Sequence, residues 1–308
     1  MKTILDVDDL TKTFGTNTVL DHISFSISRG SCYGLLGPNG AGKSTTMKLL
    51  TGILETPTGS IKILGHDVAT ARDMVQKVVG YVPQEITLYE KLSAEDNLIF
   101  FGGLYGLKGK QLKERIRTVL TDTGLLDRAN DLVKTFSGGM KRRINIASAL
   151  LHEPQILILD EPTVGIDPQS RNHIFGMIRR LRDAGVTIIY STHYMEEVEA
   201  LCDELAILDH GKMIAQGSLS DILDRFSQKA VYIENQNALG AEAYPAIKKI
   251  TPHHQGLILE CDQPLSLMRQ LLDDAAAGKI GPLHAIELMK PSLEDVFLSL
   301  TGTRLRDE

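Results

Sequence analysis

The first thirty residues largely alternate apolar and polar positions. The apolar side chains in this stretch are Ile4, Val7, Leu10, Val19, Ile23, Phe25 and Ile27. Such alternation is typical of strands that bury one face and expose the other. The start of the chain is therefore predicted to form half-exposed strands of an antiparallel sheet.

From Ser31 the pattern changes to short apolar runs separated by helical stretches. The runs predict strands buried on both faces at 32–36, 156–159 and 186–190. Helical periodicity lies between them, at 43–50, about 170–183 and 195–201. Strands that alternate with helices predict a mainly parallel sheet with helices packed on it, which is an α/β fold.

The strand signal disappears between about residues 85 and 135. Segments 93–105, 110–122 and 127–133 have helical patterns and are separated by glycines. We interpret this region as a helical subdomain inserted into the α/β core. Beyond the core helices, 206–215 predicts a hairpin.

After about Gly217 the composition shifts to a second, smaller unit. Strands are expected at 230–234, 257–261 and 283–289, helices at 265–276 and 292–300, and a loop over 235–256. The expected domains are therefore 1–217 and an accessory α/β domain at 218–308. The accessory domain carries no cluster of catalytic residue types.

Composition narrows the class of protein. The chain has 308 residues, 43% hydrophobic and 23% charged, which suits a globular protein of about two domains. Its net charge is −6, whereas a nucleic-acid binder usually has a basic face, so no nucleic-acid partner is expected. The three cysteines form no CxxC pair, which favours a reducing compartment over a disulfide or metal framework.

The sequence shows no segment expected to enter a membrane. No apolar run approaches the roughly 18–20 residues that span a bilayer. Asp6, Asp8 and Asp9 come too early for a signal peptide. We therefore expect a cytoplasmic location, with any membrane part supplied by another protein.

A glycine-rich stretch stands between the first buried run and a predicted helix. It fits GxxxxGK[ST] with Gly37, Pro38, Asn39, Gly40, Ala41, Gly42, Lys43, Ser44 and Thr45. In such a loop, backbone N–H groups and the positive end of the helix dipole face phosphate oxygens. Lys43 can reach the β- and γ-phosphates and Ser44 can ligate Mg²⁺. The alternative is a glycine-rich turn that happens to carry a lysine.

Two acids end the second buried run. Asp160 and Glu161 follow four apolar residues, and carboxylates at a buried strand end are costly unless a metal or ordered donors meet them. Asp160 is expected to hold Mg²⁺, and Glu161 to orient and polarise the water that attacks the γ-phosphate. An exposed strand end is the alternative for this motif taken alone.

A third motif opens an apolar-periodic helix. Ser137 is expected to be its N-cap, and Gly138 and Gly139 permit close approach of another backbone. A helix N-terminus with free N–H groups binds anions. Alone, this motif predicts no more than a capped helix, and its position between the other two motifs favours a role in phosphate binding.

Together these motifs resemble the ATP-binding subunit of an ABC transporter over residues 1 to about 217. The resemblance implies a P-loop ABC ATPase core with a mainly parallel sheet, an antiparallel β subdomain and the helical insertion. It implies Mg²⁺-dependent ATP hydrolysis in a homodimer, in which Ser137, Gly138 and Gly139 of one subunit cap the ATP held by the other. It also implies an integral membrane permease, a separate chain, as the partner.

The same resemblance assigns further residues. Gln84 matches the glutamine that links Mg²⁺ and water to the helical subdomain, and His193 matches the histidine that senses the γ-phosphate. Phe14 lies where the family stacks an aromatic ring on adenine, and 162–167 resembles the loop that communicates across the dimer. The implied catalytic residues are Glu161, His193 and Gln84, and the implied Mg²⁺ ligands are Ser44, Gln84 and Asp160.

Some positions depart from the common family pattern. Phe136 replaces a leucine, Met140 a glutamine, and Phe14 the commoner tyrosine, but none of these changes removes a phosphate ligand. The form Ser-Gly-Gly-Met-Lys-Arg-Arg and the ending 291–302 are similar to ATPases paired with ABC-2 type exporter permeases. An exporter working at the inner face of the cell membrane is therefore expected.

The basic run 141–143 is expected to be a solvated turn of helix, since no aromatic residues interleave to stack bases. Two alternative functions fit the sequence less well. A soluble ABC ATPase that remodels a ribosome or nucleic-acid complex usually needs a second nucleotide domain or long coiled coils, and this chain has neither. A monomeric P-loop phosphotransferase leaves the Ser137 helix and His193 without a role.

Overall fold

The computed structural model describes residues 2–56, 58–226, 229–235, 244–253, 255–289 and 292–301. The chain forms two compact units, the first running through Leu219 and the second beginning at Ser220. Among the described residues, no helix combines the length and apolar character needed to cross a membrane.

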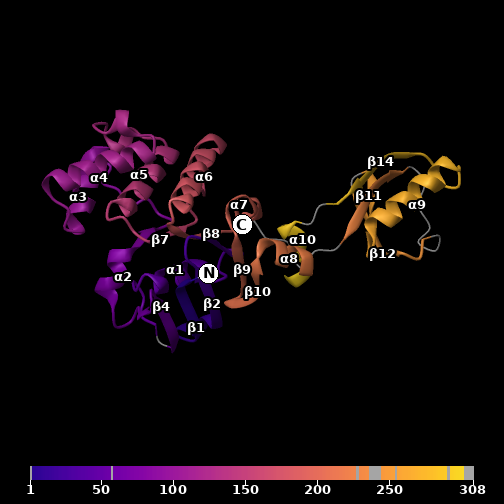
Figure 1. The fold of residues 1–308 in the computed structure, drawn as a ribbon, viewed down its shortest axis with the longest axis horizontal. Coiled ribbons are helices and arrows are strands. Elements are labelled where there is room, and N and C mark those ends of the chain that lie inside the picture. Colours follow the sequence, from indigo (N-terminus) through magenta and orange to yellow (C-terminus); the bar gives the residue numbers. More distant parts are fainter. Residues whose placement is uncertain are drawn as a thin grey trace. The chain divides into compact units, whose positions relative to one another are not determined.

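A six-stranded sheet lies at the centre of the first unit (Figure 1). Its strands, in spatial order, are β10 (Lys212–Ser218), β9 (Glu204–Asp209), β3 (Cys32–Leu36), β8 (Thr187–Thr192), β7 (Ile156–Asp160) and β6 (Val79–Val82). Only the β9–β10 hairpin pairs antiparallel. Every residue of β3, β7 and β8 is buried, as their mostly apolar runs predict. The predicted parallel sheet is confirmed.

An antiparallel sheet packs beside it. Its order is β2 (Asn17–Ser28), β1 (Thr3–Phe14), β4 (Thr58–Ile63) and β5 (His66–Asp67). The alternating apolar side chains of β1 and β2 point into a core that they share with residues of the parallel sheet, among them Leu35, Ile158 and Leu208. Strands β1 and β2 match the alternation predicted for the start of the chain, whereas β4, β5 and β6 are strands that the sequence pattern did not predict.

Helices complete the first unit. Those of the α/β core are α1 (Lys43–Leu50), α2 (Arg72–Val78), α6 (Pro168–Asp183) and α7 (Met195–Leu201). The inserted helical subdomain contains α3 (Ala94–Leu104), α4 (Gly109–Asp122) and α5 (Gly138–Leu150), which lie together in Figure 1.

The predicted helix at 127–133 is wrong. The chain there makes only two short 3₁₀ turns, η1 (Leu126–Arg128) and η2 (Val133–Thr135). The physical reason is that the backbone between these turns forms hydrogen bonds with the start of another helix, α3. The carbonyls of Ala129 and Asp131 accept the N–H groups of Glu95 and Ala94, which lack partners within α3 because they lie in its first turn.

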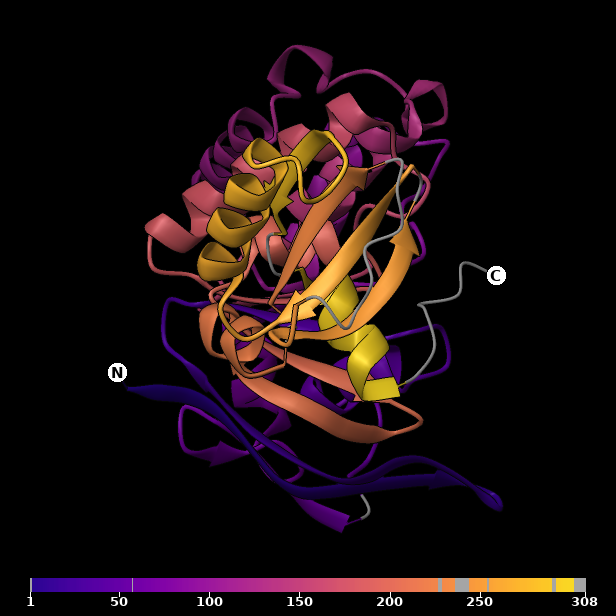
Figure 2. The ribbon, with the colours of Figure 1, turned by 90° about the vertical axis from the view of Figure 1, so that its right-hand side faces the viewer.

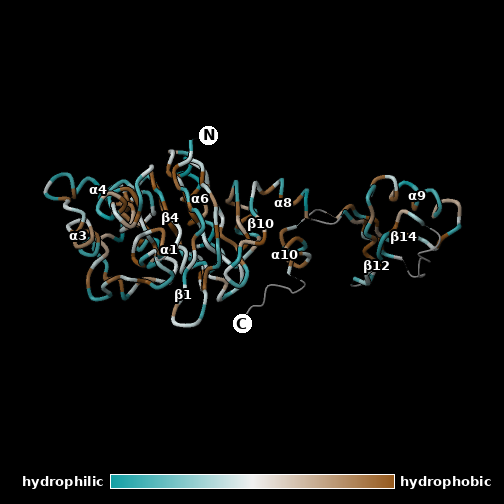
Figure 3. Tube along the Cα trace, turned by 90° about the horizontal axis from the view of Figure 1, so that it is seen from below, coloured by the Kyte–Doolittle hydropathy of each residue, from teal (hydrophilic) through white to brown (hydrophobic). Residues whose placement is uncertain are grey.

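The second unit is a small antiparallel sheet with a helix on it (Figure 2). Its strands, in order, are β12 (Ile247–His253), β13 (Gly256–Cys261), β11 (Ala230–Asn235) and β14 (Leu283–Leu288). Its helices are α8 (Leu219–Phe226), α9 (Pro264–Ala276) and α10 (Leu293–Thr301). Apolar residues of β11, β13 and α9 form its core, and Figure 3 shows hydrophobic and hydrophilic stretches alternating along the elements of both units.

The loop expected over 235–256 is corrected in part. Strand β12 occupies Ile247–His253, because Ile247 and Ile250 lie against the core while Ile250 pairs with Leu259 of β13. The two lysines between these isoleucines are exposed, which weakens the strand signal in the sequence. Residues 236–243 and 254 of the predicted loop lie outside the described residues.

Candidate functional site

The glycine-rich stretch forms the connection from strand β3 to helix α1, with Gly37–Ala41 in the loop and Lys43–Thr45 opening the helix. Gly42 is the N-cap of α1 and has a left-handed backbone with φ of 108°. A Cβ at this position would lie 2.6 Å from Leu20 Cδ2, so only glycine fits without displacing the core. The loop therefore leads the backbone directly onto the N-terminus of α1.

Lys43 lies folded over this loop and is 4% exposed. Its Nζ donates to the carbonyl oxygens of Gly37 at 2.8 Å and Pro38 at 3.1 Å. The same Nζ lies 3.0 Å from Glu161 Oε1. An ammonium has three donors, so each of these contacts uses one of them. The lysine of the first motif and the glutamate of the second thus form a buried ion pair.

Asp160, at the end of β7, is 1% exposed and surrounded by hydroxyl groups. Its Oδ1 accepts hydrogen bonds from Ser44 Oγ at 3.1 Å and Ser191 Oγ at 2.7 Å, and its Oδ2 accepts one from Tyr81 Oη at 3.4 Å. Burial, and then the charge of Asp160, raise the pKa of Tyr81 well above its ordinary value, so this phenol stays a neutral donor. Two predicted Mg²⁺ ligands, Ser44 and Asp160, are therefore in direct contact.

The Glu161 carboxylate lies beside the two other predicted catalytic residues, Gln84 and His193. Gln84 Nε2 donates to its Oε2 at 3.2 Å, and His193 Nδ1 lies 3.4 Å from its Oε1. The backbone of Glu161 is left-handed with φ of 44°. Its N–H donates to two acceptors of Ser191, the carbonyl oxygen at 3.2 Å and Oγ at 3.0 Å. A strained backbone persists only where surrounding contacts determine it, and such strain is common at functional sites.

Ser137 and its two glycines open helix α5. Ser137 is the N-cap of α5, its Oγ accepts from the Met140 N–H at 3.3 Å, and both Ser137 and Gly138 are exposed. Gly139 is buried where a Cβ would lie 2.2 Å from Ser170 Oγ at the start of α6. Within the described ranges, no hydrogen bond joins this helix start to the phosphate loop of the same chain. The third motif therefore presents an exposed helix N-terminus.

Phe14 is the last residue of β1 and its side chain is 48% exposed. The Lys12 ammonium lies 5.3 Å from the centre of its ring. An exposed ring at a strand end can stack on a planar base, and the neighbouring cation contributes an attractive interaction with the ring face.

The structure adds residues that the sequence analysis did not assign. Ser191 precedes Thr192-His193 directly, so its place in the sequence could have drawn attention to it. Tyr81 lies in strand β6, which carried no recognised signal. Both contact Asp160, which ties β6, β7 and β8 together at their carboxyl ends.

The expectation that 141–143 is a solvated turn of helix is wrong for Arg142. This side chain is 4% exposed, and its guanidinium donates to the carbonyl of Pro83 at 2.8 Å and to the carbonyl of Gln84. Burial lowers the pKa of Arg142. A guanidinium offers five donors on a long stem, so it can be buried where backbone carbonyls receive it. Arg142 thus connects the Ser137 helix to the segment that carries Gln84.

Replacing Arg142 with glutamine is expected to lower ATP turnover about tenfold or more, because Gln84 loses the contact that holds its backbone and small displacements at a reacting centre cost much. Two carbonyls lose their donor, so the free energy of unfolding should fall by about 1–3 kcal/mol. Steady-state hydrolysis and thermal unfolding measure these effects. Arg143→Gln is the control, since Arg143 lies on the same helix as Arg142 but donates to the carbonyl of Thr123 at the end of α4. Equal turnover loss in both variants would contradict this role.

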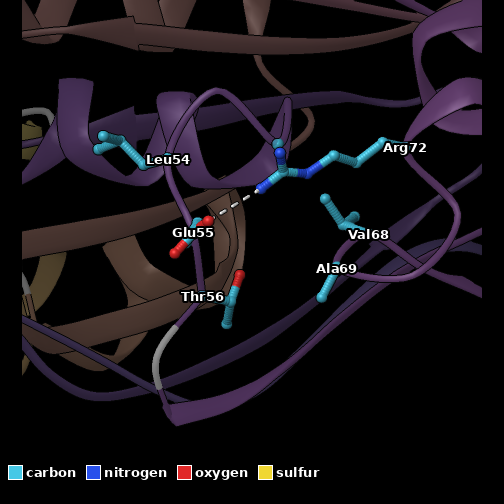
Figure 4. Close-up of a pocket in the computed structure, with 7 residues that line it drawn as sticks. Leu54, Glu55, Thr56, Val68, Ala69 and Arg72 are labelled. Atoms are coloured by element: carbon cyan, nitrogen blue, oxygen red, sulfur yellow. Dashed lines mark ion pairs between the residues drawn. The ribbon is translucent and has the colours of Figure 1, made fainter.

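A separate pocket of about 200 Å³ lies elsewhere in the first unit (Figure 4). Its lining includes Leu54, Val68 and the pair Glu55–Arg72, whose charged atoms are 3.9 Å apart. None of its lining residues belongs to the predicted site. The candidate site is therefore the polar cluster at the carboxyl ends of β3, β7 and β8.

Comparison with known proteins agrees with this geometry. Residues 20–164 match the ABC transporter family, and residues 217–301 match the C-terminal domain of DrrA1-3-like ATP-binding proteins. The chain is 41% identical to the linearmycin resistance ATP-binding protein LnrL of Bacillus subtilis, over 99% of this chain and 100% of that protein. It is 32% identical to the daunorubicin/doxorubicin resistance ATP-binding protein DrrA of Streptomyces peucetius, over 97% and 92%.

Solved structures resemble the first unit. An ATP-binding subunit of an ABC transporter superposes with a TM-score of 0.66 at 34% identity, covering 72% of this chain and 93% of that one. The protein cbiO1 from Clostridium perfringens, part of the ABC transporter complex cbiONQ, superposes with a TM-score of 0.67 at 29% identity, covering 73% of this chain and 92% of that one.

Proposed function

This chain belongs to the ABC transporter family as an ATP-binding subunit with ATPase activity, and from this premise we propose that it powers an ABC-2 type exporter. The relatives named for linearmycin resistance, daunorubicin/doxorubicin resistance and Nod factor export support an export role. Residues 1–217 are the ATPase domain in this proposal, and 218–308 the accessory domain. The complex lies at the inner face of the cell membrane through its permease.

The main observation in support of ATP hydrolysis is that three side chains converge on the Glu161 carboxylate. Lys43, Gln84 and His193 come from three separate parts of the chain and reach the same carboxylate. A buried carboxylate beside a phosphate-binding loop can orient and polarise a water for attack on the γ-phosphate. Phosphate oxygens compete with Glu161 for the Lys43 ammonium, so binding of ATP releases the carboxylate toward that water.

The residues present fit ATP with Mg²⁺. Ser44 Oγ and Asp160 are oxygen donors already in contact, and Gln84 offers a third oxygen; oxygen ligands are those that Mg²⁺ prefers. When bound there, the ion neutralises charge that develops on the phosphate oxygens. Lys43 and the N-terminus of α1 hold the phosphates, and Phe14 stacks on adenine.

The helix start at Ser137–Gly139, where Ser137 and Gly138 are exposed, binds the ATP of a second copy of the chain in this proposal. Free N–H groups at a helix N-terminus attract anions, and in the described residues this one forms no hydrogen bond with its own phosphate loop. We assign it to the γ-phosphate held by the partner subunit. ATP is then bound between two subunits, and loss of the γ-phosphate weakens the interface between them. Hydrolysis therefore shifts the dimer from the closed to the open state.

The membrane partner docks on the helical subdomain. Exposed apolar side chains gather there, and we call them the subdomain patch: Tyr89, Ile99, Phe100, Leu104 and Tyr105, between 42% and 70% exposed. The rings of Tyr89 and Phe100 pack edge to face at 5.0 Å. Exposed apolar patches of this kind mark protein interaction sites, and this one follows Gln84 in the chain. A cytoplasmic helix of the permease is the proposed occupant.

A pull-down from native membranes in mild detergent tests this function. The tagged chain is expected to recover an integral membrane protein, and Phe100→Asp should reduce that recovery at least tenfold while leaving ATP turnover within about twofold, because a charge in the patch opposes apolar burial.

Leu265→Asp is the matched control, since Leu265 is 71% exposed on α9 of the second unit. Recovery of a ribosome or nucleic acid in place of a membrane protein would favour a soluble remodelling ATPase instead.

A further inference from the structure

A buried carboxylate lies near the site without belonging to any motif assigned above. Glu197, on α7, is 1% exposed. In the part of the chain that the structure describes, no lysine, arginine or histidine forms an ion pair with it. An ionised carboxylate is costly to bury unless hydrogen bonds compensate it. Hydrogen bonds must therefore compensate the burial of Glu197.

Its partners are three buried hydroxyl groups. Thr163 Oγ1 donates to Oε1 at 2.7 Å, while Tyr190 Oη at 2.9 Å and Thr192 Oγ1 at 2.8 Å donate to Oε2. Thr163 and Tyr190 also contact each other at 3.2 Å. Hydrogen bonds to a charged acceptor are stronger than those between neutral groups, so this cluster is held firmly.

These donors flank the catalytic side chains. Thr163 follows Glu161 by two residues at the end of β7, and Thr192 directly precedes His193 at the end of β8. One carboxylate therefore anchors both segments. The anchor lies next to the left-handed backbone of Glu161, a conformation that needs such external contacts to persist.

We propose that Glu197 is a positioning residue that fixes the spacing between the Glu161 carboxylate and the His193 ring, which are 3.4 Å apart. This inference rests on the proposed function, in which both side chains act at the γ-phosphate. Each of the three hydroxyls can donate only one hydrogen bond, and each donates it to Glu197. The carboxylate accepts all three bonds at once.

Glu197→Gln tests the proposal because it keeps the shape and replaces an acceptor oxygen by an NH₂ group that faces hydroxyl donors. The expected result is a fall in kcat of about tenfold or more with KM for ATP within about threefold, since the phosphate loop is untouched. Glu196→Gln is the matched control. It removes the same charge from the same turn of α7, but Glu196 is exposed.

A second variant distinguishes loss of this anchor from a general folding defect. Thr163→Val has nearly the same shape and leaves Glu197 with two donors. Its effect on kcat should largely disappear when it is combined with Glu197→Gln, because both changes break the same anchor. Additive effects of the two changes on kcat would overturn the proposal. So would a Glu197→Gln enzyme with unchanged kcat, or one in which ATP binding weakens as much as kcat falls.

The same assay separates this inference from the proposed function. Wild-type chain and Glu161→Gln are measured in parallel. A wild type without turnover, or a Glu161→Gln chain with normal turnover, removes the proposed function and this inference with it. A normal wild type and an inactive Glu161→Gln chain beside a fully active Glu197→Gln chain remove this inference alone.

Discussion

Glu161→Gln is expected to reduce ATP turnover by about 10²–10⁴-fold, the usual contribution of a positioned general base. The amide keeps the shape and can still contact Gln84 and Lys43, but it cannot polarise the attacking water. ATP binding should remain, because the phosphate loop and Ser44 are unchanged. Since hydrolysis ends the ATP-joined state, this variant should also form a stable dimer when ATP is added.

Steady-state hydrolysis and size-exclusion chromatography with and without ATP measure both effects. Glu85→Gln is the control. It removes an equal charge beside Gln84 in the sequence, from an exposed position. Turnover close to wild type in the Glu161→Gln chain would exclude Glu161 from its proposed role, and absence of an ATP-dependent dimer would contradict the shared site.

Mixing Lys43→Ala and Ser137→Arg chains is expected to restore turnover that neither has alone. Each change should reduce turnover at least about 10²-fold, the first by removing a phosphate ligand and the second by blocking the helix start that caps the partner's ATP. In a mixed dimer both lesions fall in one site and the other site is intact. Recovery should approach about a quarter of wild type, because half of randomly formed dimers are mixed and one of their two sites works.

The control pairs Lys43→Ala with Glu161→Gln. Both lesions lie in the half of the site that each chain supplies to its own ATP, so a mixed dimer has no intact site and should recover nothing. Ser137 is exposed, and its replacement should leave thermal unfolding nearly unchanged. If the first mixture stays inactive while every chain folds normally, the ATP sites are not shared between subunits.

The predictions made from sequence succeeded where the signal was local. The buried runs of β3, β7 and β8, the glycine-rich turn before α1 and the serine that caps α5 each depend on neighbours along the chain. Periodicity and turn chemistry report such features directly. The order of strand, loop and helix was sufficient to predict an α/β core, and the motifs at its strand ends are the basis of the proposed site.

Predictions failed where a distant segment changed the outcome. Residues 127–133 have a helical pattern, yet their carbonyls serve the start of α3. The exposed lysines of β12 concealed a strand that exists because β13 pairs with it. Arg142 belongs to a charged run, but carbonyls near Gln84 draw it into the interior.

The sequence by itself therefore determined the family, the fold class and the residue types available for ATP chemistry. Only the tertiary structure decided which of them meet. Ser44 and Asp160 are 116 positions apart and lie 3.1 Å from each other, and Glu197 receives a hydroxyl from a loop 34 positions away. Periodicity describes how each segment faces the core, whereas hydrogen bonds between segments depend on how the sheet brings their ends together.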